Sequence, residues 1–198
     1  MKHVDFNTVA TSAISALVPQ LKTAYLPALD LDLADATEEE AIASLLAPGR
    51  RRAFFMNAHC CNIRRHDEDY AKAVSAADIL LPDGIGVELA GRMTGTKLTA
   101  NLNGTDLFPA LCERAAKQGL AIYLLGGSPG TAERAAAEMQ RRYPGLIVAG
   151  TQHGYFSEAE QDQILSVLDQ QGDPFFTLLL THTMEGFYGH PRHGGNKD

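Results

Sequence analysis

Short apolar runs alternate with amphipathic segments along most of the chain. A run of four to eight apolar residues bounded by turn residues predicts a buried strand, whereas apolar residues spaced by three and four predict a helix. Strands are predicted in the first half of AFFMNAHCCNI (53–63), ending at Asn57, and within ADILLPDG (77–84), LAIYLLGG (120–127), LIVAGTQHGYF (146–156) and DPFFTLLLTHTM (173–184).

The segments between these runs carry helix signals. Thr37 supplies a capping hydroxyl before Glu38–Glu40, and acidic residues in a first turn interact favourably with the helix dipole, so a helix is predicted up to about Leu46. Gly95 and Gly119 stand where two further helices should end. The remaining amphipathic segments predict helices within 67–77, 85–95, 104–119, 128–145 and 157–172.

Strands that alternate with helices of this length predict βαβ units, and therefore a parallel sheet. Continuous apolar strands are typical of a sheet that helices cover on both faces. The predicted class is α/β, with a three-layer α/β/α Rossmann-like fold and a mainly parallel sheet. A length of 198 residues suits one domain.

We assign residues 1–172 to that single α/β domain. The two ends of the chain differ in pattern from its middle. Residues 1–36 are expected to be a peripheral N-terminal segment, because LPALDLDLADA (26–36) alternates apolar and acidic residues like a half-buried edge strand or an extended arm. Residues 173–198 form an atypical C-terminal tail, since GFYGHPRHGGNKD (186–198) is glycine-rich and has no apolar periodicity.

Composition narrows the class of function. The content of 45% hydrophobic and 21% charged residues is typical of a globular protein, and a formal net charge of −7 argues against a nucleic-acid partner. Three cysteines form neither a disulfide framework nor a zinc pattern, which favours reduced thiols in the cytoplasm. We find no apolar run of about 18 residues and no clear signal-peptide cleavage site, so neither a membrane span nor a signal peptide is expected.

The distinctive polar residues follow the predicted strands. In open α/β sheets, ligands bind beyond the carboxyl ends of the strands, so these residues are expected to line one pocket. The clusters are Asn57 and His59, Asp83 and Gly84, Gly126, Gly127 and Ser128, and Gln152 and His153.

Asp83 is the centre of the predicted pocket. Pro82 restrains the turn before it, and Gly84 permits a positive φ or the close approach of a ligand. The carboxylate could be a general base, an acceptor for ribose or sugar hydroxyls, or a metal ligand. The structural alternative is that Asp83 only caps the helix that starts at Ile85.

LLGGSPGTAE (124–133) places glycines and a helix start directly after a strand. Ser128 is predicted to cap this helix, with Pro129 in its first turn. Free N–H groups at a helix start favour a phosphate or diphosphate. The segment matches neither the Walker pattern nor G-x-G-x-x-G, so an ordinary tight turn is the alternative.

NLNGTDLFP (101–109) crowds polar side chains around Gly104. The polar residues are Asn101, Asn103, Thr105 and Asp106. Thr105 and Asp106 could cap the following helix, yet four such side chains exceed what one cap needs and favour contacts to a sugar or nucleotide. No metal site is predicted, because His59, Cys60 and Cys61 would point in different directions on a strand or turn.

Six segments taken together resemble one known family. In order and spacing, they are similar to the WecG/TagA/CpsF glycosyltransferases (glycosyltransferase family 26) over about residues 50–170. The segments are NAHCCN, ADILLPDGIGVELAGRM, NLNGTDLFPAL, YLLGGSPGTAERAA, YPGL and GTQHGYF. The resemblance implies an inverting transfer of a sugar from a UDP-sugar to a lipid-diphosphate-linked saccharide in exopolysaccharide or cell-surface polysaccharide synthesis, generally without a metal or other cofactor.

The resemblance also implies roles for individual residues. Asp83 matches the family's proposed general base, Asn57 a polar residue of the pocket, and the GTDL and LLGG segments the region that lines the donor site. Family members often carry Arg near the position of Asn101. The resemblance further implies a location at the inner face of the cytoplasmic membrane, with peripheral membrane contact, and a homo-oligomer.

The family continues with a G-x-P-x-Q-E segment and a membrane-binding C-terminal appendage, which residues 173–198 do not show. A UDP-sugar-binding module without catalysis is therefore the alternative function. A nicotinamide-dependent oxidoreductase is a third hypothesis, weakened because the glycine fingerprint of dinucleotide folds is missing.

Overall fold

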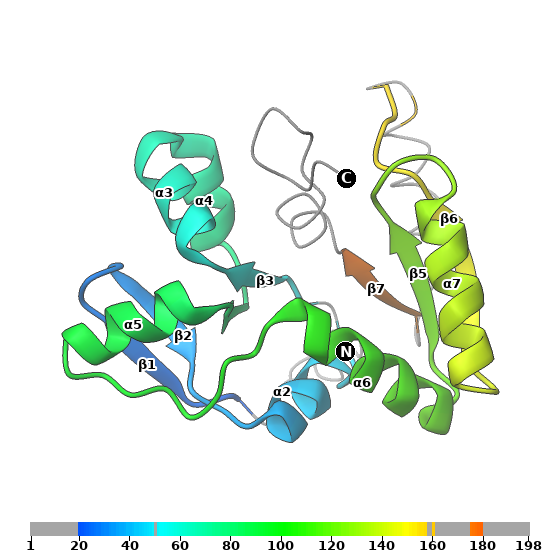
Figure 1. The fold of residues 1–198 in the computed structure, drawn as a ribbon, viewed down its shortest axis with the longest axis horizontal. Helices are drawn as coiled ribbons and strands as arrows, with labels where there is room; N and C mark the ends of the chain where they lie inside the picture. The colour runs from blue at the N-terminus through cyan, green and yellow to red at the C-terminus, as the bar shows by residue number, and fades with distance from the viewer. Residues whose placement is uncertain (1–19, 50, 158–159, 161–174, 180–198) are drawn as a thin grey trace, which may run out of the picture. The chain divides into compact units, whose positions relative to one another are not determined.

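The structure, a computed structural model, describes residues 20–49, 51–157, 160 and 175–179. These residues form two compact units, one within Met1–Asn103 and one within Gly104–Asp198 (Figure 1). The expectation of a single domain over residues 1–172 stays a prediction. In the part of the chain that the structure describes, we find no helix with the length and apolar content of a membrane span.

The first unit contains a hairpin and a parallel strand pair. The hairpin pairs β1 with β2 antiparallel, and β3 pairs with β4 in parallel through a crossover that contains two helices. The elements are β1 (Thr23–Leu26), β2 (Leu31–Ala34), α2 (Glu38–Leu45), β3 (Ala53–Met56), α3 (Ala58–His66), α4 (Glu68–Ser75), β4 (Ile79–Pro82) and α5 (Ile85–Met93).

The second unit is built on three parallel strands in the order β6-β5-β7. The predicted fifth strand is confirmed as β7, and the helix predicted over 157–172 lies almost entirely outside the described residues. The elements are α6 (Gly104–Gln118), β5 (Ala121–Leu125), α7 (Thr131–Arg142), β6 (Ile147–Gln152) and β7 (Phe175–Leu179). The parallel pairs in both units confirm the α/β class.

Local signals set several helix ends as predicted. Thr37 and Glu40 form a capping box at the start of α2, each side chain bonding the other's backbone N–H. After α5, Gly95 takes φ +82° and the Thr96 N–H donates to the Gly91 carbonyl at 2.8 Å. This arrangement is a Schellman motif, which satisfies carbonyls that the helix end would otherwise leave free.

One local prediction was wrong, and one helix was not predicted. The segment 26–36 is not one strand, because Pro27–Asp30 form the turn of the hairpin. Two apolar side chains of this segment, Leu26 and Leu33, are fully buried in the core of the first unit. The helix α3 was not predicted, although Asn57 caps its start and Arg64, Arg65 and His66 occupy its last turn, where positive charge is favourable.

Each unit has its own apolar core, and the free cysteines belong to these cores. Burial raises the pKa of the Cys112 thiol to about 12, which keeps it protonated and unreactive. The first core contains Leu26, Leu31, Leu33, Met56, Cys60, Cys61, Val74 and Val87. The second contains Cys112, Ala115, Ile122, Leu124, Ala132, Ala136, Met139 and Leu146.

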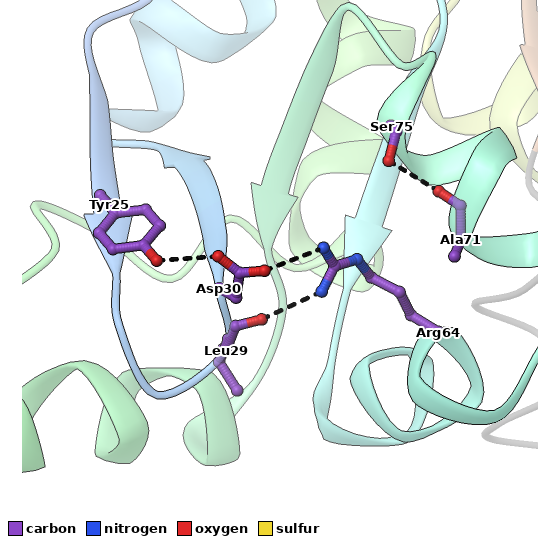
Figure 2. A network of polar contacts seen from close by, with 6 residues as sticks. All are labelled: Tyr25, Leu29, Asp30, Arg64, Ala71 and Ser75. Carbon is purple, nitrogen blue, oxygen red and sulfur yellow. Dashed lines mark hydrogen bonds and ion pairs between the residues drawn. The ribbon is translucent and has the colours of Figure 1, made fainter. Parts of the chain in front are cut away.

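Arg64 ties α3 to the turn between β1 and β2 (Figure 2). Its guanidinium donates to the Leu29 carbonyl at 3.3 Å and lies 3.6 Å from an oxygen of Asp30, whose other oxygen accepts from the Tyr25 hydroxyl at 2.8 Å. Asp30 has a positive φ of 52°, a conformation that Asp adopts more readily than most residues. The hairpin is thereby fixed to helix α3, whose N-cap is Asn57.

Asp35 fastens the end of the hairpin to a distant loop. Its carboxylate accepts from the Thr99 backbone N–H at 2.8 Å and pairs with Lys22 at 3.1 Å, and its side chain is only 9% exposed. The hydrogen bonds from Thr99, followed by Lys22, lower the pKa of this carboxyl. The ionised carboxylate is therefore the form that stabilises the fold.

We expect Asp35→Ala to lower the free energy of unfolding at pH 7 by about 1–3 kcal/mol, because it leaves the Thr99 N–H without its acceptor. The wild-type contribution is complete above the unfolded pKa of about 3.9 and is lost as the pH falls through the lower folded pKa. Urea unfolding should show a smaller difference in the free energy of unfolding between the wild type and Asp35→Ala at pH 3 than at pH 7. Asp32→Ala, on the exposed face of β2, is the control; an equal loss there would contradict the assignment.

Candidate active site

The polar residues after β3 and β4 meet at one edge of the first unit. The strands are parallel, with Met56 opposite Pro82, so both end at this edge. The Asp83 N–H donates to the Met56 carbonyl at 3.0 Å, which extends the pairing by one residue. Asn57 and Asp83 therefore lie side by side, although 26 positions separate them in the sequence.

The amide of Asn57 serves two partners. Its Oδ1 accepts from the Cys60 backbone N–H at 2.9 Å and caps α3. The same side chain hydrogen-bonds the Asp83 carboxylate, which requires its N–H group as the donor. The helix start thus orients the amide toward Asp83.

Asp83 does not cap the following helix. The N-cap of α5 is Gly84, and no side chain makes a capping hydrogen bond there. The alternative that Asp83 is only a helix cap is therefore wrong. Burial raises the pKa of the Asp83 carboxyl, and the hydrogen bond from Asn57 offsets part of that rise. A half-buried carboxylate with a raised pKa is suited to accept a proton.

Gly84 adopts a backbone conformation that belongs almost entirely to glycine, with φ +87° and ψ 165°. The Gly84 N–H donates to Oδ1 of Asn101 at 2.7 Å. Leu102, the residue after Asn101, donates its N–H to the Pro82 carbonyl at 2.8 Å. Asn101 therefore braces the turn that carries Asp83. Sequence reasoning placed Asn101 in the pocket but missed this contact.

The starts of α3 and α5 approach each other closely beside this turn. A Cβ built on Gly86 would lie 3.0 Å from the Ala58 Cβ, so glycine allows the approach. His59 is exposed in the first turn of α3, whereas Cys60 and Cys61 are buried. The expectation that these three residues lie on a strand or turn was wrong. Within the described part of the chain, no group of His, Cys, Asp or Glu side chains could hold a metal ion.

The second unit has a comparable edge after β5 and β6. The Gly126 N–H donates to the Gln152 carbonyl at 2.9 Å, and the Gly154 N–H donates to the Gly127 carbonyl at 2.9 Å. His153 accepts the Tyr155 backbone N–H on Nδ1 at 3.2 Å, so a neutral His153 carries its proton on Nε2. This edge therefore combines glycine backbone with an imidazole N–H donor.

The helix α7 starts later than predicted. Its N-cap is Gly130, in the left-handed region with φ +82°, and no side chain caps it. The Ser128 carbonyl accepts from the Thr131 N–H at 2.9 Å, so Ser128 and Pro129 form a turn before the helix. The prediction that Ser128 caps α7 and Pro129 lies in its first turn was wrong.

The polar run 101–106 is divided between a loop (101–103) and the start of helix α6. Asn101 bonds the Gly84 turn, and Asn103 immediately precedes α6. Helix α6 starts at Gly104, so Thr105 and Asp106 lie inside its first turn and do not occupy the N-cap position. Both are exposed, and Gly104 is buried. Sugar contacts by these residues stay a prediction.

Comparison with known proteins identifies the family. A profile of the "Glycosyl transferase WecG/TagA/CpsF family" matches residues 26–175, and the chain belongs to this family. The resemblance drawn from the sequence motifs is thereby confirmed.

Two relatives carry the name N-acetylglucosaminyldiphosphoundecaprenol N-acetyl-beta-D-mannosaminyltransferase. The protein from Bacillus subtilis (strain 168) is 32% identical over 130 residues, which cover 64% of this chain and 49% of that protein. The protein from Bacillus spizizenii (strain ATCC 23059 / NRRL B-14472 / W23) is 29% identical over 124 residues, which cover 63% and 48%. The matched regions span about half the length of these relatives.

We expect Asp83→Asn to raise the free energy of unfolding at pH 7, because it removes a charge whose burial is unfavourable and keeps an oxygen that can accept from Asn57. The folded protein holds the Asp83 proton more tightly than the unfolded chain does. This cost therefore grows as the pH rises past the unfolded pKa of about 3.9 and is absent below it.

Thermal and urea unfolding at pH 3 and pH 7 measure this difference. Asp69→Asn, at an exposed position of α4, is the control and should give no gain. A less stable Asp83→Asn protein at pH 7 would contradict a burial cost at Asp83.

Proposed function

We propose that this protein is an inverting glycosyltransferase that moves a sugar from a UDP-sugar to a lipid-diphosphate-linked saccharide. Family membership supports transfer of a glycosyl group. The observation that carries the proposal is the half-buried Asp83 carboxylate, which the Asn57 amide orients and which caps no helix.

Asp83 would act as the general base. Its carboxylate takes the proton of an acceptor hydroxyl as that oxygen attacks the anomeric carbon of the donor sugar. The bond from the anomeric carbon to the UDP oxygen breaks, and its electron pair leaves on the diphosphate. Attack opposite the leaving group inverts the anomeric centre. A raised pKa suits this role, because it makes the carboxylate a stronger base than a solvent-exposed Asp.

We assign the donor diphosphate to the turn after β5. Gly126 and Gly127 both have positive φ there, and the turn leads into the start of α7, where backbone N–H groups and the helix dipole favour anions. His153 adds an imidazole N–H at the same edge. The glycines keep side chains away from the backbone that would approach the phosphates.

The names of the two relatives suggest the acceptor. Both name an N-acetylglucosaminyl group on diphosphoundecaprenol as the acceptor and an N-acetylmannosaminyl group as the sugar transferred. We propose an acceptor of the same chemistry, a saccharide joined through diphosphate to a polyprenol, for this protein. A polyprenol resides in a membrane, so the proposed site of action is the cytoplasmic face of the cell membrane, in the synthesis of a surface polysaccharide.

We expect Asp83→Asn to lower kcat for transfer by roughly 10²- to 10⁴-fold, the range that a general base contributes. UDP-sugar binding, measured by calorimetry, should change little, because the base acts on the acceptor. Asp69→Asn is again the control. Unchanged turnover would contradict the role of Asp83, and binding without turnover in the wild type would favour a binding module.

Asn57→Asp tests the Asn57–Asp83 contact. Aspartate also caps helices well, so α3 should remain intact. The new carboxylate lies beside Asp83, and a neighbouring like charge raises a carboxyl pKa. The acid limb of the kcat/KM profile should therefore move to higher pH. Asn62→Asp, at an exposed position of the same helix, should leave the profile in place; an equal shift there would show a general charge effect.

A further inference from the structure

Helix α5 has apolar side chains on two opposite faces. Val87 and Gly91 face inward, and a Cβ built on Gly91 would lie 3.5 Å from the Leu26 side chain. Ile85, Leu89 and Met93, spaced by four residues, are 73%, 54% and 79% exposed. We call these three side chains the α5 ridge. Residues four apart stack along one side of a helix, so the ridge is a continuous stripe about 12 Å long.

The charged residues beside the ridge neutralise each other, which lowers the electrostatic cost of bringing the ridge to an apolar surface. Glu88 and Arg92, the two charged residues of α5, form an ion pair with each other and leave no net charge on the helix. Lys97, four residues beyond Met93, is exposed. The end of the ridge away from Asp83 therefore lies close in sequence to a cation that can attract anionic headgroups.

The ridge begins next to the proposed catalytic base. Ile85 is two residues after Asp83, and the rest of the ridge leads away from it along α5. An acceptor whose hydroxyl reaches Asp83 carries its polyprenyl chain at its other end, and that chain is held in a bilayer. An apolar stripe that starts at the site fits a surface from which such an acceptor is drawn.

We propose that the α5 ridge docks on the surface of a lipid bilayer. This inference rests on the proposed lipid-linked acceptor, and it assigns the contact to three named side chains. A helix lying in the membrane interface inserts its apolar side chains about 5–10 Å deep, which suits a single stripe of this kind. A stable protein dimer buries roughly 800 Å² per partner, far more than three aliphatic side chains on one short helix supply.

The first experiment measures cosedimentation of the full chain with vesicles of phosphatidylethanolamine and phosphatidylglycerol. Leu89→Ser should weaken binding roughly tenfold, and Leu89→Ser with Met93→Ser on the order of a hundredfold. Ile147→Ser is the matched control, because Ile147 is 49% exposed on β6 and lies outside the ridge. Equal losses for Leu89→Ser and Ile147→Ser would overturn the proposal.

The second experiment uses the absence of tryptophan from the chain. Met93→Trp introduces a single tryptophan at the end of the ridge, and its emission should shift to the blue when these vesicles are added. Ile147→Trp should show no shift. An unshifted Met93→Trp spectrum would overturn the proposal, as would a ridge-dependent dimer that shows no vesicle binding in size-exclusion chromatography and cosedimentation.

A transfer assay with a short-chain, water-soluble acceptor separates this inference from the proposed function. The ridge variants should keep wild-type turnover on that acceptor and lose it on polyprenyl acceptor in vesicles. If the wild type transfers nothing but binds vesicles through the ridge, the proposed function fails and the docking surface stands. If turnover is normal but vesicle binding does not depend on the ridge, only the docking surface fails.

Discussion

The hydrogen bond from the Asn57 amide to the Asp83 carboxylate is the contact on which the first unit's site depends. One planar group accepts the Cys60 N–H at the start of α3 with its oxygen, and its hydrogen bond to Asp83 lowers the pKa of that carboxyl. The parallel register of β3 and β4 places the two residues at the same edge. A change in register would separate them, even if each strand and helix still formed.

The candidate site contains a carboxylate, Asp83, whose negative charge is disfavoured by its partial burial. Burial raises the pKa of Asp83, and the Asn57 hydrogen bond compensates only in part. The surrounding backbone is held by other interactions: Asn101 fixes Gly84, and the Leu102 N–H bonds the Pro82 carbonyl. The half-buried Asp83 carboxylate can be tolerated because neighbouring hydrogen bonds, rather than the Asp83 side chain, maintain the turn.

Local signals predicted the elements where a few neighbouring residues decide the outcome. The capping box at Thr37 and the helix ends at Gly95 and Gly119 depend on interactions within one turn. The predicted start of α7 was wrong because Ser128 and Pro129 form a separate turn. Gly130, in the left-handed region, is the N-cap, so the helix begins only at Thr131. Helix α3 was missed because its buried face is short and cysteine-rich, whereas its cap and its basic last turn could have indicated it.

The α/β class, the family and the residues that follow the strands could be predicted from the sequence, because strand and helix periods and the order of motifs depend on neighbouring positions. The contacts between those residues became known only from the folded structure. Asn57 reaches Asp83 across 26 positions, and Asn101 bonds Gly84 across 17. Such pairs depend on strand register and on the path of the chain between elements, and no local pattern contains that information. For the same reason, only the structure showed that Asp83 caps no helix and that Ile85, Leu89 and Met93 face outward.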